Sequence, residues 1–187
     1  AATADDSREI VVTAQFRQQR LQDTPLAITA LAAAALAQRG ITDVSDLAQT
    51  APNVNITNSS PSFGASVAVY IRGIGQYDNN FAYEPGVGIY LDDVYYGVMT
   101  GADFQLADVD RVEVLRGPQG TLAGKNSLGG AIKLYSRKPT GSNEGYIETT
   151  FGNYNKLGIR GGYDIALNPD NLFMRISGFS DHRDGYV

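Results

Sequence analysis

Three stretches in the last third of the chain alternate apolar and polar residues, and this period of two constrains the possible folds most. The stretches are residues 146–151, 157–165 and 172–177, separated by turn-forming segments at 152–155 and 168–171. Successive side chains of a strand point to opposite faces, so each stretch predicts a strand with one apolar face. Two interpretations stay open, because strands of about ten residues are typical of transmembrane β-barrels and the pattern also fits an antiparallel sheet on a soluble core.

The region before residue 141 predicts a compact α+β domain of short strands and small helices. Residues 32–39 are strong helix formers followed by Gly40, and residues 44–50 predict a second helix with Asp43 as its cap. Strands are expected at 66–74, 87–91, 94–96, 111–115 and 131–136, with Asp92 and Asp93 in a hairpin or a bend and exposed loops at 53–65 and 75–84.

The 187 residues therefore divide into a polar tail at 1–22, an α+β domain at 23–140 and the alternating strands at 141–187. The tail holds one β-branched island around Val11 and Val12, which fits either a docking peptide or a first edge strand. No apolar run approaches the roughly 18 residues of a membrane-spanning helix. The small residues at the N-terminus would suit a chain left after secretory cleavage.

Composition excludes several classes of protein. The net charge is -5 and no cluster of Lys and Arg supplies the phosphate-neutralising charge of a nucleic-acid binder. Cysteine is absent, which excludes disulfides and thiolate metal sites within these residues. The acidic pairs Asp92/Asp93 and Asp108/Asp110 lack the spacing of a calcium loop, so turn and capping roles are expected for them. We expect neither a metal nor a cofactor.

An enzyme is not expected, because the parts of a catalytic site are missing. The one histidine, His182, stands among charged residues, and no cysteine or Gly-x-Ser-x-Gly elbow could partner it. Residues 120–126 superficially suggest a phosphate-binding loop. The pattern requires a glycine where Gln119 stands and a hydroxyl where Asn126 stands, so we reject it.

A glycine-rich motif in the middle of the chain, RVEVLRGPQGTL at residues 111–122, continues through residues 124–132. It resembles the plug of TonB-dependent receptors. Residues 71–73 (IRG), 87–94 (VGIYLDDV) and 9–14 (EIVVTA) resemble the upstream strand motif, the middle strand pair and the TonB box of that family, in the family's order. The resemblance covers essentially the whole chain.

The resemblance implies an α+β plug domain, with a small mixed sheet and short helices, followed by the first antiparallel strands of a 22-stranded transmembrane β-barrel. Such a barrel needs several hundred residues, so this chain is expected to be part of a longer protein. The location is then the outer membrane of a Gram-negative bacterium, with the N-terminal tail in the periplasm. The implied partners are TonB with its inner-membrane motor complex, outer-membrane lipid and a small-molecule ligand.

The implied function is TonB-dependent transport of a scarce nutrient, such as siderophore-iron or a similar chelate, a glycan or another organic ligand. The alternative is a plug-like interaction or scaffold module without transport. The expected TonB-binding residues are Glu9, Ile10, Val11, Val12, Thr13 and Ala14. The expected latches between plug and barrel, chosen because charges in covered strands must be paired, are Arg72, Glu113 and Arg116. The expected ligand-facing loop residues are Asn58, Ser60, Phe63, Gln76, Tyr77, Asp78, Asn79, Phe81 and Tyr83.

Overall fold

The computed structural model describes residues 11–13, 19–59, 64–123 and 126–185. The chain divides into two compact units, which are described separately. Unit 1 comprises Ala1–Leu106 and Arg111–Tyr135, and unit 2 comprises Ala107–Asp110 and Ser136–Val187. The chain therefore passes into unit 2 twice. Within the described ranges, no helix has the length and apolar character needed to cross a membrane.

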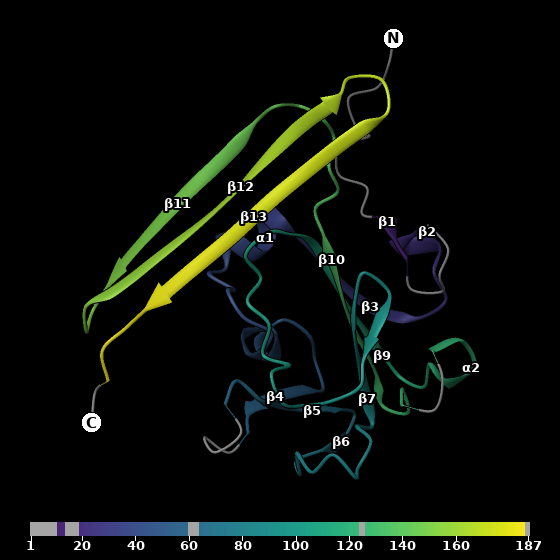
Figure 1. Cartoon of the computed structure of the whole chain (residues 1–187). Helices are drawn as coiled ribbons and strands as arrows, with labels where there is room; N and C mark the ends of the chain where they lie inside the picture. Colours follow the sequence, from purple (N-terminus) through teal and green to yellow (C-terminus); the bar gives the residue numbers. More distant parts are fainter. Residues whose placement is uncertain (1–10, 14–18, 60–63, 124–125, 186–187) are drawn as a thin grey trace. The chain divides into compact units, whose positions relative to one another are not determined.

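Unit 1 is built on a five-stranded mixed sheet with the order β3-β9-β10-β7-β8 (Figure 1). These strands are β3 (Ala27–Ala32), β9 (Val109–Arg116), β10 (Gly130–Ser136), β7 (Val87–Leu91) and β8 (Val94–Tyr96). β10 and β7 are parallel, whereas β3 pairs antiparallel with β9 and β7 with β8. β10 and β7 are buried over almost their whole length, as expected for parallel strands covered on both faces. The predicted α+β fold with a mixed sheet is confirmed.

A second sheet of unit 1 corrects two expectations. Its strands are β4 (Val54–Asn58), β5 (Val67–Ile71) and β6 (Ile74–Gln76). The expected loop at 53–65 contains β4, because Val54 and Ile56 alternate with polar residues and are buried. The expected strand at 66–74 reverses direction at Arg72 and Gly73, whose φ angles are 53° and 80°. Two consecutive left-handed residues form the tight turn that suits the twist of a β-hairpin.

The helices of unit 1 are short. α1 (Ala33–Gln38) is followed by Gly40 with a φ of 64°, as predicted. The second predicted helix is a 3-10 helix, Ser45–Gln49, and its start differs from the prediction. The carboxylate of Asp46, not of Asp43, accepts the backbone N–H groups of Thr42 and Asp43 at 2.8 and 3.1 Å. A shorter 3-10 helix spans Leu21–Asp23, and α2 spans Gly120–Ala123.

Unit 2 contains one antiparallel sheet with the order β11-β12-β13, drawn in green to yellow in Figure 1. The three strands are β11 (Gly145–Gly152), β12 (Lys156–Asn168) and β13 (Leu172–His182). All three predicted strands are confirmed, and each extends beyond the alternating stretch that predicted it. The ladder between β12 and β13 runs from Leu157 opposite His182 to Asn168 opposite Leu172, with one irregularity after Ala166.

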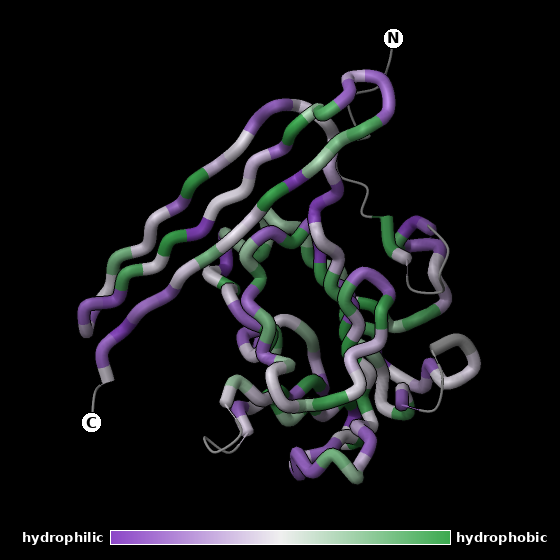
Figure 2. Tube along the Cα trace, viewed as in Figure 1, coloured by the Kyte–Doolittle hydropathy of each residue, from purple (hydrophilic) through white to green (hydrophobic). Residues whose placement is uncertain are grey.

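The register of this sheet assigns its side chains to two faces, because residues directly opposite each other share a face. Figure 2 shows hydrophobic and hydrophilic residues alternating along the strands. On one face the exposed apolar residues are Ile147, Phe151, Leu157, Ile159, Tyr163 and Ile176. The other face carries cross-strand charge pairs, Glu148 opposite Arg160 and Asp164 opposite Arg175. Ile147 is 83% exposed and Phe151 is 76% exposed, so the apolar face is uncovered.

Candidate functional site

The N-terminal segment Val11–Thr13 is docked on unit 1 as a short strand, which agrees with the second of the two interpretations that the sequence left open, a first edge strand. β1 (Val11–Val12) pairs antiparallel with β2 (Gln19–Arg20). Val12 is fully buried in a cluster with Tyr90, Leu115 and Ala131, whereas Val11 is 43% exposed. A valine side chain buried in this way stabilises the docked state by about 1.5–3 kcal/mol. Docking therefore fixes one of the two valines and leaves the other accessible.

All three polar groups of Thr13 are bound by charged side chains. Its backbone N–H donates to Glu113 Oε1 at 2.9 Å. Arg111 Nη2 donates to its hydroxyl at 2.6 Å, and Lys133 Nζ donates to its carbonyl at 3.4 Å. Hydrogen bonds with an ionised partner are the stronger class, so three of them hold a single residue of an extended segment. We call Glu113, Arg111 and Lys133 the Thr13 clamp.

The clamp belongs to a larger, partly buried network whose two positive and two negative side chains balance. Arg111 Nε lies 2.9 Å from Glu113 Oε1, and Lys133 Nζ lies 3.2 Å from Asp93 Oδ1. The hydroxyl of Tyr135 donates to the same Asp93 oxygen at 2.9 Å, and the guanidinium of Arg111 lies 3.9 Å from the centre of the Tyr135 ring. Burial, followed by the negative charge of Glu113, raises the pKa of Tyr135, so its hydroxyl remains a donor in the physiological pH range.

Weakening the clamp is expected to release Thr13. Glu113→Gln removes the charge that receives the Thr13 N–H. Because hydrogen bonds to charged groups contribute about 1.5–3 kcal/mol, the undocked fraction should rise about tenfold or more. Maleimide labelling of a Val12→Cys variant measures this fraction, since the 187 residues contain no other cysteine. The matched control is Glu148→Gln, which breaks an exposed pair worth about 0–1 kcal/mol. Equal labelling rates in the two variants would contradict a clamping role for Glu113.

The three residues expected to act as latches lie in different surroundings. Glu113 is fully buried in the clamp. Arg72 stands exposed in the turn between β5 and β6, not within a strand, and a Cβ added to Gly117 would lie 3.0 Å from its Nη1. Arg116 Nη1 donates to the Pro52 carbonyl at 3.4 Å, and Arg116 Nε is buried with no partner among the described residues.

The residues expected to face a ligand separate into exposed and structural ones. Tyr77, Phe81 and Tyr83 are 60%, 75% and 56% exposed in the loop that follows β6. Asn79 is buried, and its side-chain amide donates to the Ser59 hydroxyl at 2.6 Å. Asn58 and Gln76 belong to β4 and β6, and the Asp78 carboxylate accepts the backbone N–H of Asn80 at 2.9 Å. Glu9, Ile10, Ala14, Ser60 and Phe63 lie outside the described residues.

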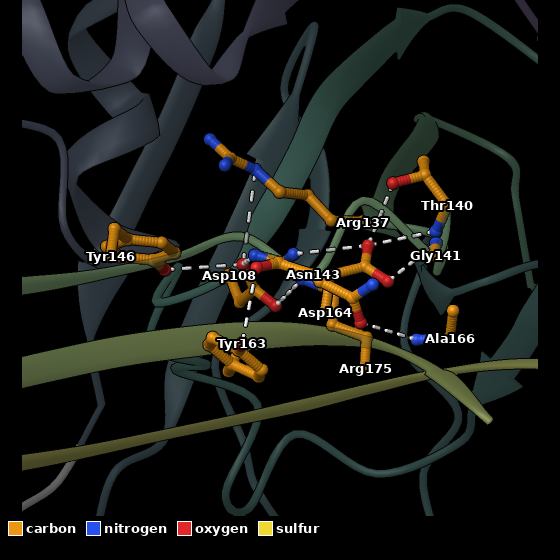
Figure 3. Close-up of polar contacts among 10 residues, drawn as sticks. All are labelled: Asp108, Arg137, Thr140, Gly141, Asn143, Tyr146, Tyr163, Asp164, Ala166 and Arg175. Atoms are coloured by element: carbon orange, nitrogen blue, oxygen red, sulfur yellow. Dashed lines mark hydrogen bonds and ion pairs between the residues drawn. The ribbon is translucent and has the colours of Figure 1, made fainter.

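Unit 2 contains a second polar site, centred on Arg175 of β13 (Figure 3). Its Nε and Nη2 donate to the two carboxylate oxygens of Asp108 at 2.7 and 2.8 Å. The hydroxyl of Tyr146 donates to the same carboxylate at 3.2 Å, and Arg137 Nε lies 3.9 Å away. Burial acts to raise the pKa of Asp108, but the bonds and charge of Arg175 outweigh it and hold that pKa below its usual value. Asp108 thus lies in a turn, as expected, and is in addition an ion-pair partner of Arg175.

A second carboxylate completes the cluster. Asp164 on β12 is 2% exposed and accepts three hydrogen bonds, from the Thr140 N–H at 2.9 Å, the Thr140 hydroxyl at 3.0 Å and the Gly141 N–H at 2.8 Å. Arg175 Nη1 lies 3.7 Å from Asp164 Oδ2. We call Asp108, Asp164 and Arg175 the Arg175 cluster. No group of three or more potential metal ligands occurs in the part of the chain that the structure describes.

Comparison with known proteins identifies the family. The model of the TonB-dependent Receptor Plug Domain matches residues 20–131, more than half of the chain. The pesticin receptor of Yersinia pestis is 34% identical over 144 residues, which cover 76% of this chain and 21% of that receptor. The ferripyoverdine receptor of Pseudomonas aeruginosa is 29% identical over 133 residues, which cover 71% of this chain and 16% of that receptor.

Solved structures agree in fold. The ferric yersiniabactin uptake receptor FyuA from Yersinia pestis superposes with a TM-score of 0.73 at 28% identity, over 82% of this chain and 24% of that one. The pyoverdine outer membrane receptor FpvA from Pseudomonas aeruginosa gives a TM-score of 0.78 at 21% identity, over 97% and 26% of the two chains. This chain spans about a fifth of the length of its curated relatives. It belongs to the plug-domain family of the TonB-dependent receptors.

Proposed function

We propose that this chain is the plug and the first barrel strands of a TonB-dependent receptor that imports a scarce nutrient across the outer membrane of a Gram-negative bacterium. The observation that carries this proposal is the family match over residues 20–131. The plug closes the lumen of the barrel, and the transport step requires its rearrangement. The proposed division is a periplasmic tail at 1–22, the plug at 23–140 and the barrel from 141 onward.

A ferric siderophore is the ligand class that we propose first. Relatives of this chain are named as ferric yersiniabactin, ferripyoverdine and ferrioxamine receptors. The exposed aromatic side chains of Tyr77, Phe81 and Tyr83 suit an organic chelate, because they offer flat apolar surface with hydroxyl groups at the rim. A glycan or another organic ligand would use the same chemistry and remains the second class.

TonB is the proposed partner of residues 9–14. An extended β-branched segment can add a strand to a partner's sheet, with main-chain hydrogen bonds giving affinity and alternate side chains giving specificity. Val12 is fully buried and Thr13 is held by its clamp, so a partner that pairs with both residues requires them to leave unit 1. Release of the Thr13 clamp is therefore the proposed gate on access to the energising partner.

The sheet of unit 2 is the proposed start of the barrel. Its apolar face, with Ile147 and Phe151 largely exposed, is suited to outer-membrane lipid, and its charged face is suited to the polar interior. Unpaired backbone groups are not tolerated in hydrocarbon, so the edges of β11 and β13 require further strands. A closed barrel of 22 strands is the size at which a plugged lumen is expected.

Arg72 and Arg116 remain the proposed latches between plug and barrel wall. Arg116 Nε is buried without a partner among the described residues, and a carboxylate of the barrel wall would satisfy it. Glu113 also remains a proposed latch, because Arg111 and Thr13 use only its Oε1, and its Oε2 is buried without a partner among the described residues.

The full-length receptor, expressed in a host that lacks its own siderophore receptors, is expected to restore TonB-dependent growth on at least one ferric siderophore under iron limitation. Phe81→Ala with Tyr83→Ala should weaken binding of that chelate about tenfold, because buried aromatic contacts each contribute more than about 1 kcal/mol to an interface. Tyr154→Ala, which removes an exposed aromatic ring elsewhere, is the matched control. Growth on no chelate, or growth without TonB, would contradict the proposed function.

A further inference from the structure

One arginine holds both segments by which the chain passes into unit 2. The first segment is Ala107–Asp110, and the second begins at Ser136. Arg175 binds Asp108 of the first segment through two hydrogen bonds of 2.7 and 2.8 Å. It also approaches to 3.7 Å of Asp164, whose carboxylate binds Thr140 and Gly141 of the second segment (Figure 3).

The two segments are also joined by their backbones. The Arg137 N–H donates to the Asp108 carbonyl at 3.1 Å. The Tyr146 hydroxyl, from β11, donates to the Ala107 carbonyl at 2.7 Å. One backbone hydrogen bond thus joins the two segments to each other, and side chains from all three strands, Tyr146 of β11, Asp164 of β12 and Arg175 of β13, attach them to the sheet.

The sequence around the cluster leaves room for these contacts. A Cβ added to Gly162 would lie 2.9 Å from Arg175 Nη2, so a larger residue there would displace the guanidinium. Gly141 has a φ of 73°, and a Cβ added to it would lie 2.3 Å from the Phe173 ring. The side chains of Arg175 and Asp108 are 12% and 11% exposed, whereas those of Arg160 and Glu148 on the same sheet face are 25% and 48% exposed. A shielded two-bond pair of this kind is held far more firmly than an exposed one.

We propose that the Arg175 cluster is the fixed anchor of the plug. This inference rests on the proposed function. When the energising partner pulls the N-terminal segment, the Thr13 clamp opens while the Arg175 cluster stays closed. Residues 107 and 136–141 then keep their contacts while unit 1 rearranges. The plug therefore remains attached to the barrel sheet through both segments and can refold into its closed state after each transport cycle. Arg175 acts here as a positioning residue, since it contacts neither ligand nor TonB in this scheme.

The experiment uses single cysteines in the full-length receptor in living cells, labelled with a maleimide with and without the proton gradient and ligand. Val12→Cys reports release of the N-terminal segment, and Ala107→Cys reports opening of the anchor. The expected result is a labelling rate that rises at least about tenfold at position 12 on energisation and is unchanged at position 107. In an Arg175→Gln background, labelling at position 107 should rise on energisation as well.

Arg160→Gln is the matched control, because it breaks an exposed ion pair on the same sheet face and should leave the labelling rate at position 107 unchanged on energisation. Asp108→Asn replaces Arg175→Gln if the latter does not assemble. If the labelling rate at position 107 rises on energisation in the receptor with an intact Arg175 cluster, the anchor is wrong and the proposed function stands. The same conclusion follows if position 107 is labelled at the same rate in the Arg175→Gln and Arg160→Gln receptors. If the labelling rate rises at neither position and the receptor takes up no ligand, both the proposed function and the anchor are wrong. If the labelling rate rises at neither position while uptake is normal, the N-terminal segment is not released during transport. That result contradicts the pulling of this segment, on which the anchor depends.

Discussion

Replacing Val11 with proline is expected to abolish nutrient uptake by the full-length receptor while binding of the ligand at the outer face survives. Proline lacks the N–H that a paired strand donates and blocks the approach of a neighbouring strand. Val11 is 43% exposed and is not a member of the buried cluster around Val12, so the substitution removes no side chain from that cluster. We expect uptake to fall to the level of a strain without TonB, because a segment that cannot be paired cannot be pulled.

Uptake and surface binding of one radiolabelled ferric chelate, measured on the same cells, separate the two effects. Val11→Thr is the control, since threonine is β-branched like valine and keeps its N–H. The corresponding change at Val12 would be less informative, because that side chain is fully buried and its replacement also disturbs unit 1. Undiminished uptake by Val11→Pro would show that residues 9–14 do not form the TonB box.

The 187-residue polypeptide on its own is expected to aggregate in aqueous buffer or to require detergent, whereas residues 1–140 stay in solution and at least partly folded. The sheet of unit 2 exposes a row of apolar side chains, of which Ile147 and Phe151 are the most exposed. Its edge strands β11 and β13 also offer unpaired backbone groups, which are templates for association with another chain. Unit 1 instead closes its apolar residues on one another, as the burial of Ile71, Val112 and Leu134 shows.

Sedimentation of the two polypeptides in detergent-free buffer measures the difference. A variant of the longer chain with Ile147→Thr, Phe151→Thr and Ile159→Thr is the matched control. It lowers the apolar area of the face and keeps β-branched residues that suit strands, so it should aggregate less. A monodisperse monomer of the unmodified 187 residues would mean that these strands belong to a soluble sheet, and the barrel assignment would be wrong.

Local pattern was a sufficient guide wherever neighbouring residues decide the structure. The alternation that predicts β11, β12 and β13 depends only on the two-residue period of a strand. The hairpin at Asp92 and Asp93 was also predictable, and both residues adopt the left-handed conformation that such a turn requires. The prediction of an exposed loop at residues 53–65 was wrong, because the turn-forming Asn and Ser residues around β4 outnumber its two buried apolar residues, Val54 and Ile56.

The sites were less predictable than the strands, because each joins residues far apart in the chain. Residue types alone cannot show that Thr13 meets Glu113 or that Asp108 meets Arg175, since no local period links positions so distant. One signal was available. Lys133 interrupts an otherwise apolar strand, and a buried charge of this kind requires a partner. The identity of that partner was not available from the sequence.

By itself, then, the sequence of this protein determined most of the strand pattern, the turn at Asp92 and Asp93 and the family to which the plug belongs. Only the tertiary structure decided that Val12 is buried, that Glu113 serves the N-terminal segment and that Arg175 holds the two segments leading into unit 2. The physical reason is that side-chain period and turn conformation are local properties of a few residues. Burial and charge pairing are properties of the space enclosed when distant segments pack, and they exist only in the folded chain.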